Sequence, residues 1–376
     1  MKSLGNTLLT ILCAVLWAGC GRLPSGSVSN DGSDAPEEVL FQISDVRMAE
    51  EYKMAPRCKM FVFGKGFLKG DSLRIVSQSE GIGPVDMVLP SAAFSDMILG
   101  IVPEGLPDDS YELFIKRGRG LFSLGSATLL FDEGYRPRPW GLVPHRGDTE
   151  QGAPDNSIEA LRRAIDAGVF GTEFDVRLSG DDIPIVCHEA KMDTYEPELE
   201  SIPYSEIAQR YHFHNGETIN TLDAFLTAVG KDRHTRLFMD IKQQSTKEKT
   251  LHLTDLALAA IKKFGLEYIT DYMSVDFDVC MKIAATKPHG LVGYLAWMQD
   301  ELDAIRAGTT FLPMARSHFI EDPERFARYK ASGVPLNTGA DTPEEFEWVL
   351  ENGIDIIGTD HLSVGLKYIH HRFVEY

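Results

Sequence analysis

Two patterns of hydrophobic and polar residues divide the chain. Between about residues 39 and 134, apolar and polar positions alternate in short segments that Gly, Pro and Asp interrupt. Alternation with a period of two is typical of strands that bury one face, and no amphipathic helical repeat separates these segments. The predicted strands are 58–63, 72–76, 97–102, 111–117 and 127–131. The pattern therefore predicts a small all-β sandwich over 39–134.

After a linker rich in Pro and Arg at 134–139, apolar runs alternate with helical repeats up to the C-terminus. The predicted strands are 142–145, 172–176, 237–241, 268–275, 291–295, 310–314, 334–337 and 354–358. The clearest predicted helices are 157–167, 247–264, 323–331 and 343–352. Eight such alternations within 140–376 favour a (β/α)8 barrel of the TIM type. A doubly wound open sheet is the weaker alternative.

The first residues have the pattern of an export signal. Lys2 supplies a positive charge, an apolar run covers 8–17, and the small residues Ala18 and Gly19 precede Cys20. The run is too short to span a bilayer. Small residues before a cysteine resemble a bacterial lipobox, in which the cysteine is lipidated and becomes the new N-terminus. We expect a signal peptide at 1–19, with simple cleavage or an uncleaved anchor as alternatives to lipidation.

The segment 20–38 begins with this cysteine and continues with many Ser, Gly, Asp and Pro residues. Such a composition predicts a flexible tether. The N-terminal features together predict an exported protein of the bacterial cell envelope that a lipid anchor holds at a membrane.

Composition narrows the classes of partner. The 376 residues include 56 acidic and 37 basic side chains, and a net charge of −19 repels polyanions, so we expect no nucleic-acid partner. The shares of hydrophobic residues (43%) and charged residues (25%) are those of ordinary globular domains. Beyond the N-terminal region, Cys58, Cys187 and Cys280 have neither metal-site spacing nor that of a disulfide framework. We expect them to be buried thiols.

Carboxylates gather where the predicted barrel strands end, which is where barrels carry their functional side chains. Glu173 and Asp175 stand two apart on the second strand, so both point to the same side. Asp240 and Lys242 have the same spacing on the third strand. Three inward carboxylates without cysteine ligands favour one hard divalent cation, Mg²⁺ or Ca²⁺, over zinc.

Two histidines stand near these carboxylates in the predicted barrel. His145 ends the first strand and Arg146 follows it, while His188 comes soon after the second strand. Histidine exchanges protons near neutral pH, so two histidines beside a carboxylate cluster are candidates for proton transfer.

At these positions the sequence resembles the glycerophosphodiester phosphodiesterase family. Its members open with a His-Arg-Gly strand end, continue with a Pro-Glu-Asn-Thr helix start, and then carry a Glu-x-Asp strand and a second His. The matching residues here are 145–147, 154–157, 173–175 and 188, together with 353–360 near the C-terminus. The resemblance extends over 140–376 and implies hydrolysis of glycerophosphodiesters to glycerol 3-phosphate and an alcohol.

The resemblance also implies roles for individual residues. It makes His145 and His188 the acid/base pair. It makes Glu173, Asp175 and Asp240 the ligands of one divalent cation, and it assigns phosphate binding to Arg146 and Lys242. Asp155 and Asp240 replace glutamates of the family. Because the side chain at 240 is one methylene shorter, we expect a lower affinity for the cation.

The stretches 64–71 and 106–111 resemble the immunoglobulin-like IPT/TIG modules of surface proteins. For such a module we favour a role as a spacer, and the binding of a glycan or a protein partner is the alternative.

Two other functions stay open for the barrel. One is a lysophospholipase-D-like or phospholipase-like diesterase at a membrane surface. The other is a surface-binding lipoprotein with a lapsed barrel, although none of His145, His188, Glu173 and Asp175 is lost.

Overall fold

The computed structural model describes residues 42–369, except for 49–50, 55–58, 69, 80, 88–92, 95–96, 102–104, 132–140, 195, 233–234, 268, 287, 289, 296–300 and 333. The predicted signal peptide at 1–19, Cys20 and the tether lie outside the described residues, as do Cys58 and the linker at 134–139. In the described part, no helix has the length and apolar composition that a membrane crossing requires.

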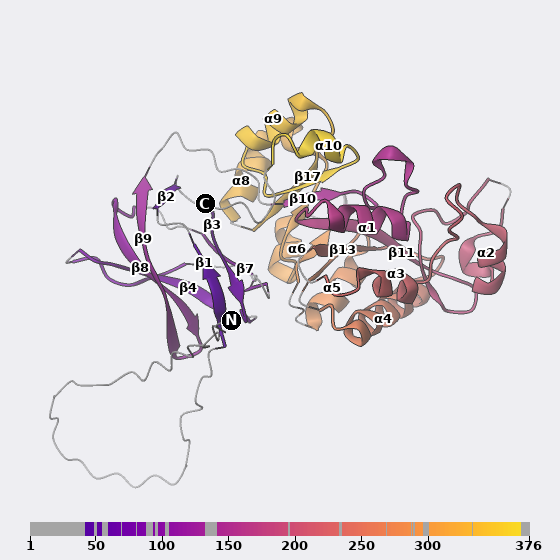
Figure 1. The fold of residues 1–376 in the computed structure, drawn as a ribbon, viewed down its shortest axis with the longest axis horizontal. Helices are drawn as coiled ribbons and strands as arrows, with labels where there is room; N and C mark the ends of the chain where they lie inside the picture. The colour runs from indigo at the N-terminus through magenta and orange to yellow at the C-terminus, as the bar shows by residue number, and fades with distance from the viewer. Residues whose placement is uncertain are drawn as a thin grey trace, which may run out of the picture. The chain divides into compact units, whose positions relative to one another are not determined.

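The N-terminal part of the described chain forms two sheets (Figure 1). Their strand orders are β1-β3-β7-β6 and β2-β9-β8-β4-β5. The strands are β1 (Ser44–Arg47), β2 (Glu51–Met54), β3 (Lys59–Lys65), β4 (Ser72–Ser77), β5 (Val85–Asp86), β6 (Ala93–Phe94), β7 (Met97–Ile101), β8 (Asp109–Arg117) and β9 (Gly120–Phe131). Each of the five predicted strands overlaps one of these.

Alternation in β8 shows how the sequence produces one buried face. Tyr111, Leu113 and Ile115 are buried, and the residues between them are only partly covered. They join Val62 of β3 and Ile98 of β7, which belong to the other sheet, in one apolar cluster. Residues two apart on a strand share a face, so the pattern predicts which side is buried. The immunoglobulin-like assignment of this module stays a prediction.

The C-terminal part forms a ring of parallel strands. They are β10 (Gly141–Pro144), β11 (Gly171–Leu178), β13 (Arg236–Ile241), β14 (Thr270–Ser274), β15 (Val292–Tyr294), β16 (Leu312–Pro313), β17 (Leu336–Gly339) and β18 (Ile356–Thr359). Parallel ladders join β11, β13, β14 and β15 in turn, and join β16, β17, β18 and β10. A bridge between Gly293 and Phe311 links the two groups, and β10 lies beside β11. The predicted (β/α)8 barrel is therefore confirmed.

One short strand was not predicted. Residues Pro184–Val186 form β12, which pairs with β11 in the antiparallel direction and extends that side of the barrel sheet.

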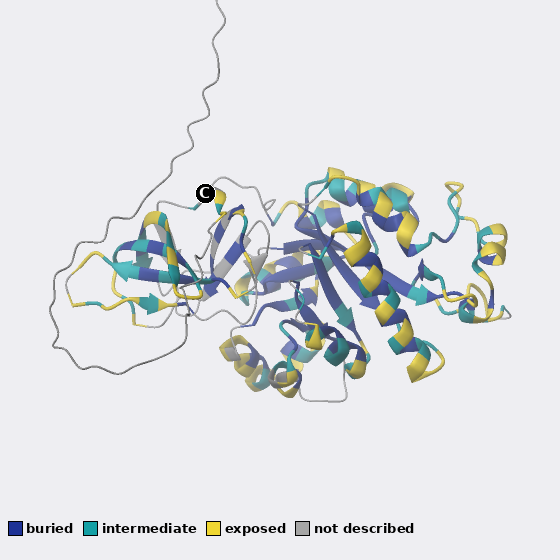
Figure 2. Ribbon diagram, turned by 90° about the horizontal axis from the view of Figure 1, so that it is seen from below, coloured by how far each residue is buried: buried dark blue, intermediate teal, exposed yellow. Residues whose placement is uncertain are grey.

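Helices alternate with the barrel strands and cover them from outside, except that α2 lies apart at the right-hand edge of Figure 1 (Figures 1 and 2). They are α1 (Ile158–Asp166), α2 (Tyr204–Arg210), α3 (Leu222–Val229), α4 (Lys247–Phe264), α5 (Phe277–Ala285), α6 (Glu301–Ala307), α7 (Arg316–Glu321), α8 (Pro323–Ser332), α9 (Pro343–Glu351) and α10 (Leu362–Gly365), with 3₁₀ turns η1 (Glu150–Gly152) and η2 (Leu199–Ser201). The four predicted helices correspond to α1, α4, α8 and α9, and their ends agree within one residue.

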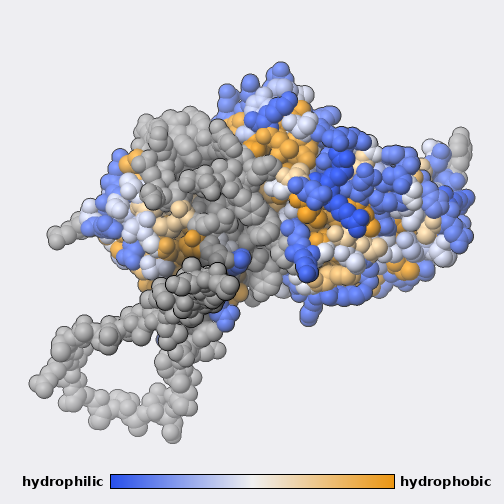
Figure 3. All heavy atoms as spheres, in the orientation of Figure 1, coloured by the Kyte–Doolittle hydropathy of each residue, from blue (hydrophilic) through white to orange (hydrophobic). Residues whose placement is uncertain are grey.

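Local sequence sets where these helices begin and end. The Ser157 hydroxyl accepts a hydrogen bond from the Ala160 N–H and caps α1. Thr342 and Glu345 form a capping box at the start of α9. Helix α4 ends at Gly265, whose φ of 62° lies in the left-handed region that glycine tolerates. On the face shown in Figure 3, hydrophilic residues cover much of the barrel's outer surface between smaller hydrophobic patches.

The inner face of β13 shows how the barrel interior leads up to its mouth. At the N-terminal end, the buried Arg236 pairs with the buried Asp271 at 2.6 Å. Next comes Phe238, whose ring packs near two other phenylalanine rings at centroid distances of 6.2 and 6.4 Å. Asp240 follows, and Lys242 comes just after the strand. The strand therefore passes from a structural ion pair, through an aromatic layer, to the charged residues singled out in the sequence.

The two cysteines that the structure describes are free thiols, Cys187 and Cys280, and both are buried. Burial raises the pKa of the Cys187 thiol to about 11. The prediction of buried thiols is confirmed for these two residues.

Candidate functional site

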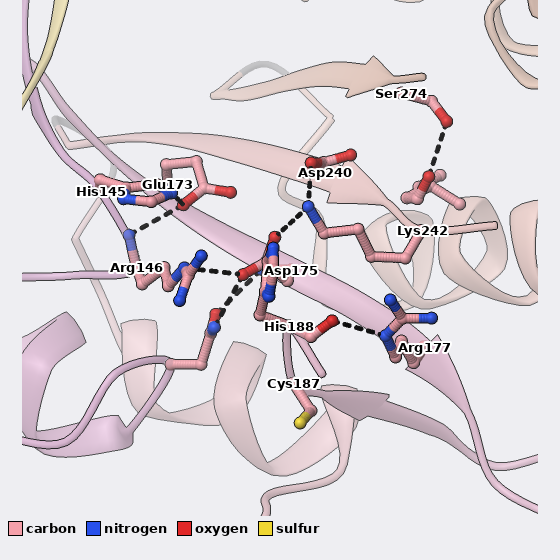
Figure 4. A network of polar contacts seen from close by, with 12 residues as sticks. His145, Arg146, Glu173, Asp175, Arg177, Cys187, His188, Asp240, Lys242 and Ser274 are labelled. Atoms are coloured by element: carbon pink, nitrogen blue, oxygen red, sulfur yellow. Dashed lines mark hydrogen bonds and ion pairs between the residues drawn. The ribbon is translucent and has the colours of Figure 1, made fainter. Parts of the chain in front are cut away.

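Three carboxylates converge at the mouth of the barrel (Figure 4). Glu173 and Asp175 lie on β11, and Asp240 lies opposite Asp175 in the register of β11 and β13. One ligand oxygen from each residue lies within 4.8 Å of the other two, and all three side chains are buried. The convergence expected from the spacing in the sequence is therefore observed.

Backbone geometry at the end of β10 holds Glu173 in place. The Arg146 N–H donates a hydrogen bond of 2.8 Å to Glu173 Oε2. Arg146 has a φ of 57° and Gly147 a φ of 89°, so the chain turns sharply here. A Cβ at Gly147 would lie 2.6 Å from the Cβ of Ala160, which explains why glycine is needed at this turn. A non-glycine residue in the left-handed region is uncommon, and such strain is concentrated at functional sites.

Asn156 orients Asp175. Its side-chain amide donates to Asp175 Oδ2 at 2.8 Å, and its carbonyl oxygen accepts from the Asp175 backbone N–H at 2.9 Å. Asn156 also has a positive φ, of 58°. The two hydrogen bonds fix both the strand and its carboxylate, so Asn156 supports the cluster although the sequence argument assigned it no role.

Two positively charged side chains, Lys242 and Arg146, lie against the carboxylates. The Lys242 ammonium lies 2.8 Å from Asp175 Oδ1 and 2.5 Å from Asp240 Oδ2. The Arg146 guanidinium lies 3.5 Å from Asp175 Oδ2 and donates to Asp155 Oδ2 at 3.0 Å. Both predicted phosphate-binding residues thus face the cluster, where they would meet an anion bound beside it.

Burial and mutual repulsion change the acidity of the cluster. Burial, and then the charges of Asp175 and Asp240, raise the pKa of Glu173 well above its usual value. Burial also raises the pKa of Asp240, against the pull of Lys242. For Asp175 burial again favours the neutral form, but the ammonium of Lys242 and the hydrogen bond from Asn156 bring its pKa below the usual value. Glu173 is thus the carboxyl that most readily keeps a proton.

The donor set fits a hard divalent cation. Besides the convergent oxygens, Asp240 Oδ1 is buried and has no hydrogen-bond partner among the described residues. Burying an unpaired carboxylate oxygen is costly, and an oxygen-seeking cation would satisfy it. Glu173, Asp175 and Asp240 are the residues that would hold such an ion.

The two histidines lie near the cluster (Figure 4), and each meets a carboxylate through Nδ1. His145 Nδ1 lies 2.8 Å from Asp360 Oδ1, and His145 Nε2 lies 4.0 Å from Glu173 Oε2. His188 Nδ1 lies 2.7 Å from Glu189 Oε1. Each ring therefore keeps Nε2 on the side away from its carboxylate partner.

A cavity of about 400 Å³ opens beside the cluster. Its charged and ionisable lining residues include His145, Glu173 and Asp240, together with Asp341 and Asp360. Its apolar lining residues include Val143, Phe238, Met273, Leu295, Pro313, Met314 and Ala315. The cavity thus combines charged and apolar lining, as a ligand with one ionic and one neutral part requires.

Asp341 and Asp360 were not among the site residues expected from the sequence. Asp360 directly follows β18, and Asp341 lies between β17 and α9. Both positions obey the rule that functional side chains follow barrel strands, and that rule is the signal in the sequence that could have identified them.

Comparisons with known proteins agree with this geometry. The glycerophosphoryl diester phosphodiesterase family matches the chain over residues 145–364. A glycerophosphodiester phosphodiesterase of Caldanaerobacter subterraneus subsp. tengcongensis is 26% identical over 232 residues, which cover 58% of this chain and 93% of that protein.

Solved structures are similar as well. A glycerophosphodiester phosphodiesterase from Parabacteroides distasonis has 28% sequence identity and a TM-score of 0.56, over 61% of this chain and 96% of its own. A phosphodiesterase of Oleispira antarctica in complex with the product sn-glycerol-3-phosphate has 20% identity and a TM-score of 0.51, over 61% of this chain and 96% of its own. The second likeness concerns the fold alone.

Proposed function

The chain belongs to the glycerophosphoryl diester phosphodiesterase family, a family of phosphoric diester hydrolases, and we propose that it hydrolyses glycerophosphodiesters to glycerol 3-phosphate and an alcohol. The observation that carries this proposal is the convergence of Glu173, Asp175 and Asp240 beside the cavity that His145 lines. A phosphodiester is an anion. The cluster would attract this anion only through a bound cation, which we propose to be one Mg²⁺ or Ca²⁺ ion.

Each group of the site has a defined part in this reaction. Glu173, Asp175 and Asp240 would hold a divalent cation, which would supply positive charge to offset that of the phosphodiester. Arg146 and Lys242 hold the phosphoryl oxygens through hydrogen bonds from their charged groups. As the bond from water oxygen to phosphorus forms, one of His145 and His188 accepts the water's proton. As the bond from phosphorus to the alcohol oxygen breaks, the other histidine donates a proton to the leaving group.

The test is an assay of the purified protein on a panel of soluble glycerophosphodiesters. Release of glycerol 3-phosphate is measured with Mg²⁺, with Ca²⁺ and with excess chelator. We expect product with a divalent ion and none in chelator. Full activity in chelator, or no product from any member of the panel with either ion, would contradict the proposal.

A second substrate class is favoured by the apolar residues that line the cavity, among them Met273, Leu295 and Pro313. An acyl chain would bury apolar surface there, so a lysophospholipid diester is the alternative substrate. Parallel assays on lysophospholipid vesicles and on glycerophosphocholine separate the two. A preference for the vesicles in kcat/KM would identify the lipid as the substrate.

The location of the protein is part of the proposal. The pattern that ends at Cys20 supports export and lipid anchoring in the bacterial cell envelope, with residues 1–19 as the signal peptide. Within this arrangement the module at 39–134 serves as a spacer or binds a glycan or protein, and the barrel at 140–376 carries the reaction.

A further inference from the structure

We propose that Asp360 is a positioning residue, which holds the His145 ring so that Nε2 exchanges protons with the reacting groups. The inference deepens the proposed function and depends on it for its kinetic consequences. It rests on the 2.8 Å contact between Asp360 Oδ1 and His145 Nδ1, and on the way the fold secures both residues.

The barrel ladder places the two residues side by side although they are 215 positions apart in the sequence. Strand β10 pairs with β18 in parallel, and Pro144 lies opposite Thr359. The His145 N–H then donates a hydrogen bond of 2.9 Å to the Thr359 carbonyl oxygen. His145 and Asp360 therefore leave neighbouring strands at the same level.

A second set of contacts fixes the segment that carries Asp360. Asp341 Oδ1 accepts from the Asp360 N–H at 2.7 Å and from the Thr359 hydroxyl at 3.1 Å. The Asp341 N–H in turn donates to Glu345 Oε2 at 2.7 Å, at the start of α9. The backbone at Asp360 is therefore held by contacts among the end of β18, the segment after β17 and the start of α9.

The chemistry of the contact determines which ring nitrogen is protonated. An ionised carboxylate only accepts hydrogen bonds, so His145 Nδ1 carries the hydrogen and donates it to Asp360. In neutral His145, Nε2 is then the nitrogen with a free electron pair. It faces the carboxylate cluster, 4.0 Å from Glu173 Oε2, on the side where the cavity lies. The pair thus selects both the tautomer and the direction of the ring.

The other histidine provides a contrast within the same site. His188 also meets a carboxylate, but Glu189 is its neighbour in the chain, whereas Asp360 follows the last barrel strand; the two carboxylate side chains are similarly exposed, 62% for Glu189 and 59% for Asp360. The Glu189 backbone oxygen accepts a 3.6 Å contact from the Cys187 thiol, a weaker restraint than the hydrogen bonds of 2.7 and 3.1 Å by which Asp341 holds the Asp360 N–H and the Thr359 hydroxyl. The effect of removing Asp360 should therefore fall on His145 alone.

Kinetics of Asp360→Asn and Asp360→Glu, at saturating divalent ion, test the proposal. Proton transfer by a positioned side chain contributes roughly 10²- to 10⁴-fold to a rate, so loss of its orientation should lower kcat by roughly 10- to 100-fold. KM should stay within about twofold, because Asp360 does not hold the phosphate. Asp360→Glu keeps a carboxylate, which only accepts hydrogen bonds, whereas the amide of Asn can also donate one, so Asp360→Glu should recover most of the lost kcat.

Asp278→Asn is the matched control. Asp278 is an exposed carboxylate on α5 that pairs with Lys247 and touches neither histidine. Its kcat should equal that of the wild type. If Asp360→Asn behaves like this control, or if Asp360→Glu is as slow as Asp360→Asn, the positioning role is wrong.

Ring nitrogen NMR provides a readout that needs no substrate. The His145 signals are identified by their loss in His145→Ala. We expect hydrogen on Nδ1 in the wild type, and a mixture of tautomers in Asp360→Asn. A wild-type protein without product on any glycerophosphodiester would overturn the proposed function, whereas hydrogen on Nε2 instead of Nδ1 in the wild type would overturn the role of Asp360.

Discussion

Adding Mg²⁺ or Ca²⁺ to the metal-free protein should raise its melting temperature, and by more at pH values above the raised pKa of Glu173 than at pH values below it. The site holds three buried carboxylates beside two cationic side chains, Lys242 and Arg146, and Arg146 also pairs with Asp155, so negative charge is in excess. Two unit charges 4.8 Å apart repel by about 3 kcal/mol at an effective dielectric constant of about 20. A proton on Glu173 or a divalent cation relieves this repulsion.

The direction of the pH dependence follows from the raised pKa of Glu173. A carboxyl whose pKa is higher in the folded state than in the unfolded state binds protons more tightly when folded. Its stabilising contribution is complete below the unfolded pKa and is lost as pH rises through the folded pKa. The metal-free protein should therefore lose stability with rising pH over that window. The cation replaces the proton, so the cation's effect should grow over the same window.

The size of the effect can be estimated from binding linkage. A ligand at 100 times its Kd stabilises the folded state by about 2.7 kcal/mol. For domains of about 150–250 residues each kcal/mol shifts Tm by about 2–4 °C, which gives roughly 5–11 °C. Differential scanning calorimetry in chelator and in excess cation, at two pH values, measures both quantities.

Glu173→Gln is the informative variant for this experiment, because it removes the carboxyl with the raised pKa and keeps its shape. In chelator its Tm should depend less on pH than that of the wild type, and the gain from the cation should shrink to within about 2 °C. Equal Tm values with cation and with chelator in the wild type, or identical gains in wild type and Glu173→Gln, would refute this account of the cluster.

Four further outcomes are expected. His145→Ala and His188→Ala should each lower kcat by roughly 10²- to 10⁴-fold, with an unchanged circular dichroism spectrum. A substrate with a very good leaving group should rescue only the variant that lacks the acid. Near wild-type rates in either variant would exclude this acid/base pair. Asp240→Asn should raise the metal concentration needed for half-maximal activity far more than Asp240→Glu, whereas coinciding titration curves would make this carboxylate structural. Cys20→Ser should release the protein from the membrane fraction or block its maturation, and a wild-type protein found wholly in the soluble fraction would contradict the anchor. Gly147→Ala should lower the free energy of unfolding by about 1–3 kcal/mol in urea titrations, because the φ of 89° disfavours a side chain and the new Cβ would lie 2.6 Å from the Cβ of Ala160. An unchanged free energy of unfolding would show that the turn adapts to the side chain.

The sequence predicted the barrel well because its signal is local and repeated. Each barrel strand is an apolar run flanked by turn residues, and α4 has caps at both ends, Thr246 and Gly265. The convergence of Glu173 and Asp175 was also predictable, because the two-residue period of a strand puts both on one side. Strand β12 was not predicted: it is as short as β15, but it pairs in the antiparallel direction outside the strand–helix alternation on which the barrel prediction depended.

Contacts that join distant parts of the chain could not be predicted in the same way. The pairing of His145 with Asp360 exists only because the last barrel strand returns beside the first. Asn156 reaches Asp175 because the chain adopts a positive φ at Asn156, which no spacing rule reveals. These contacts depend on closure of the ring and on backbone turns rather than on local periodicity.

Closure of the strand ring also explains why the charged side chains of the site interact strongly with one another. Below Asp240, the buried Phe238 and the Arg236–Asp271 ion pair fill the barrel interior. Buried groups interact more strongly than groups in water, since little solvent screens them. The shorter side chain of Asp240 lies opposite Asp175, and Lys242 bridges the two. A cation that binds there competes with the lysine ammonium, and an ammonium displaced from the carboxylates would be available to the phosphate of the substrate.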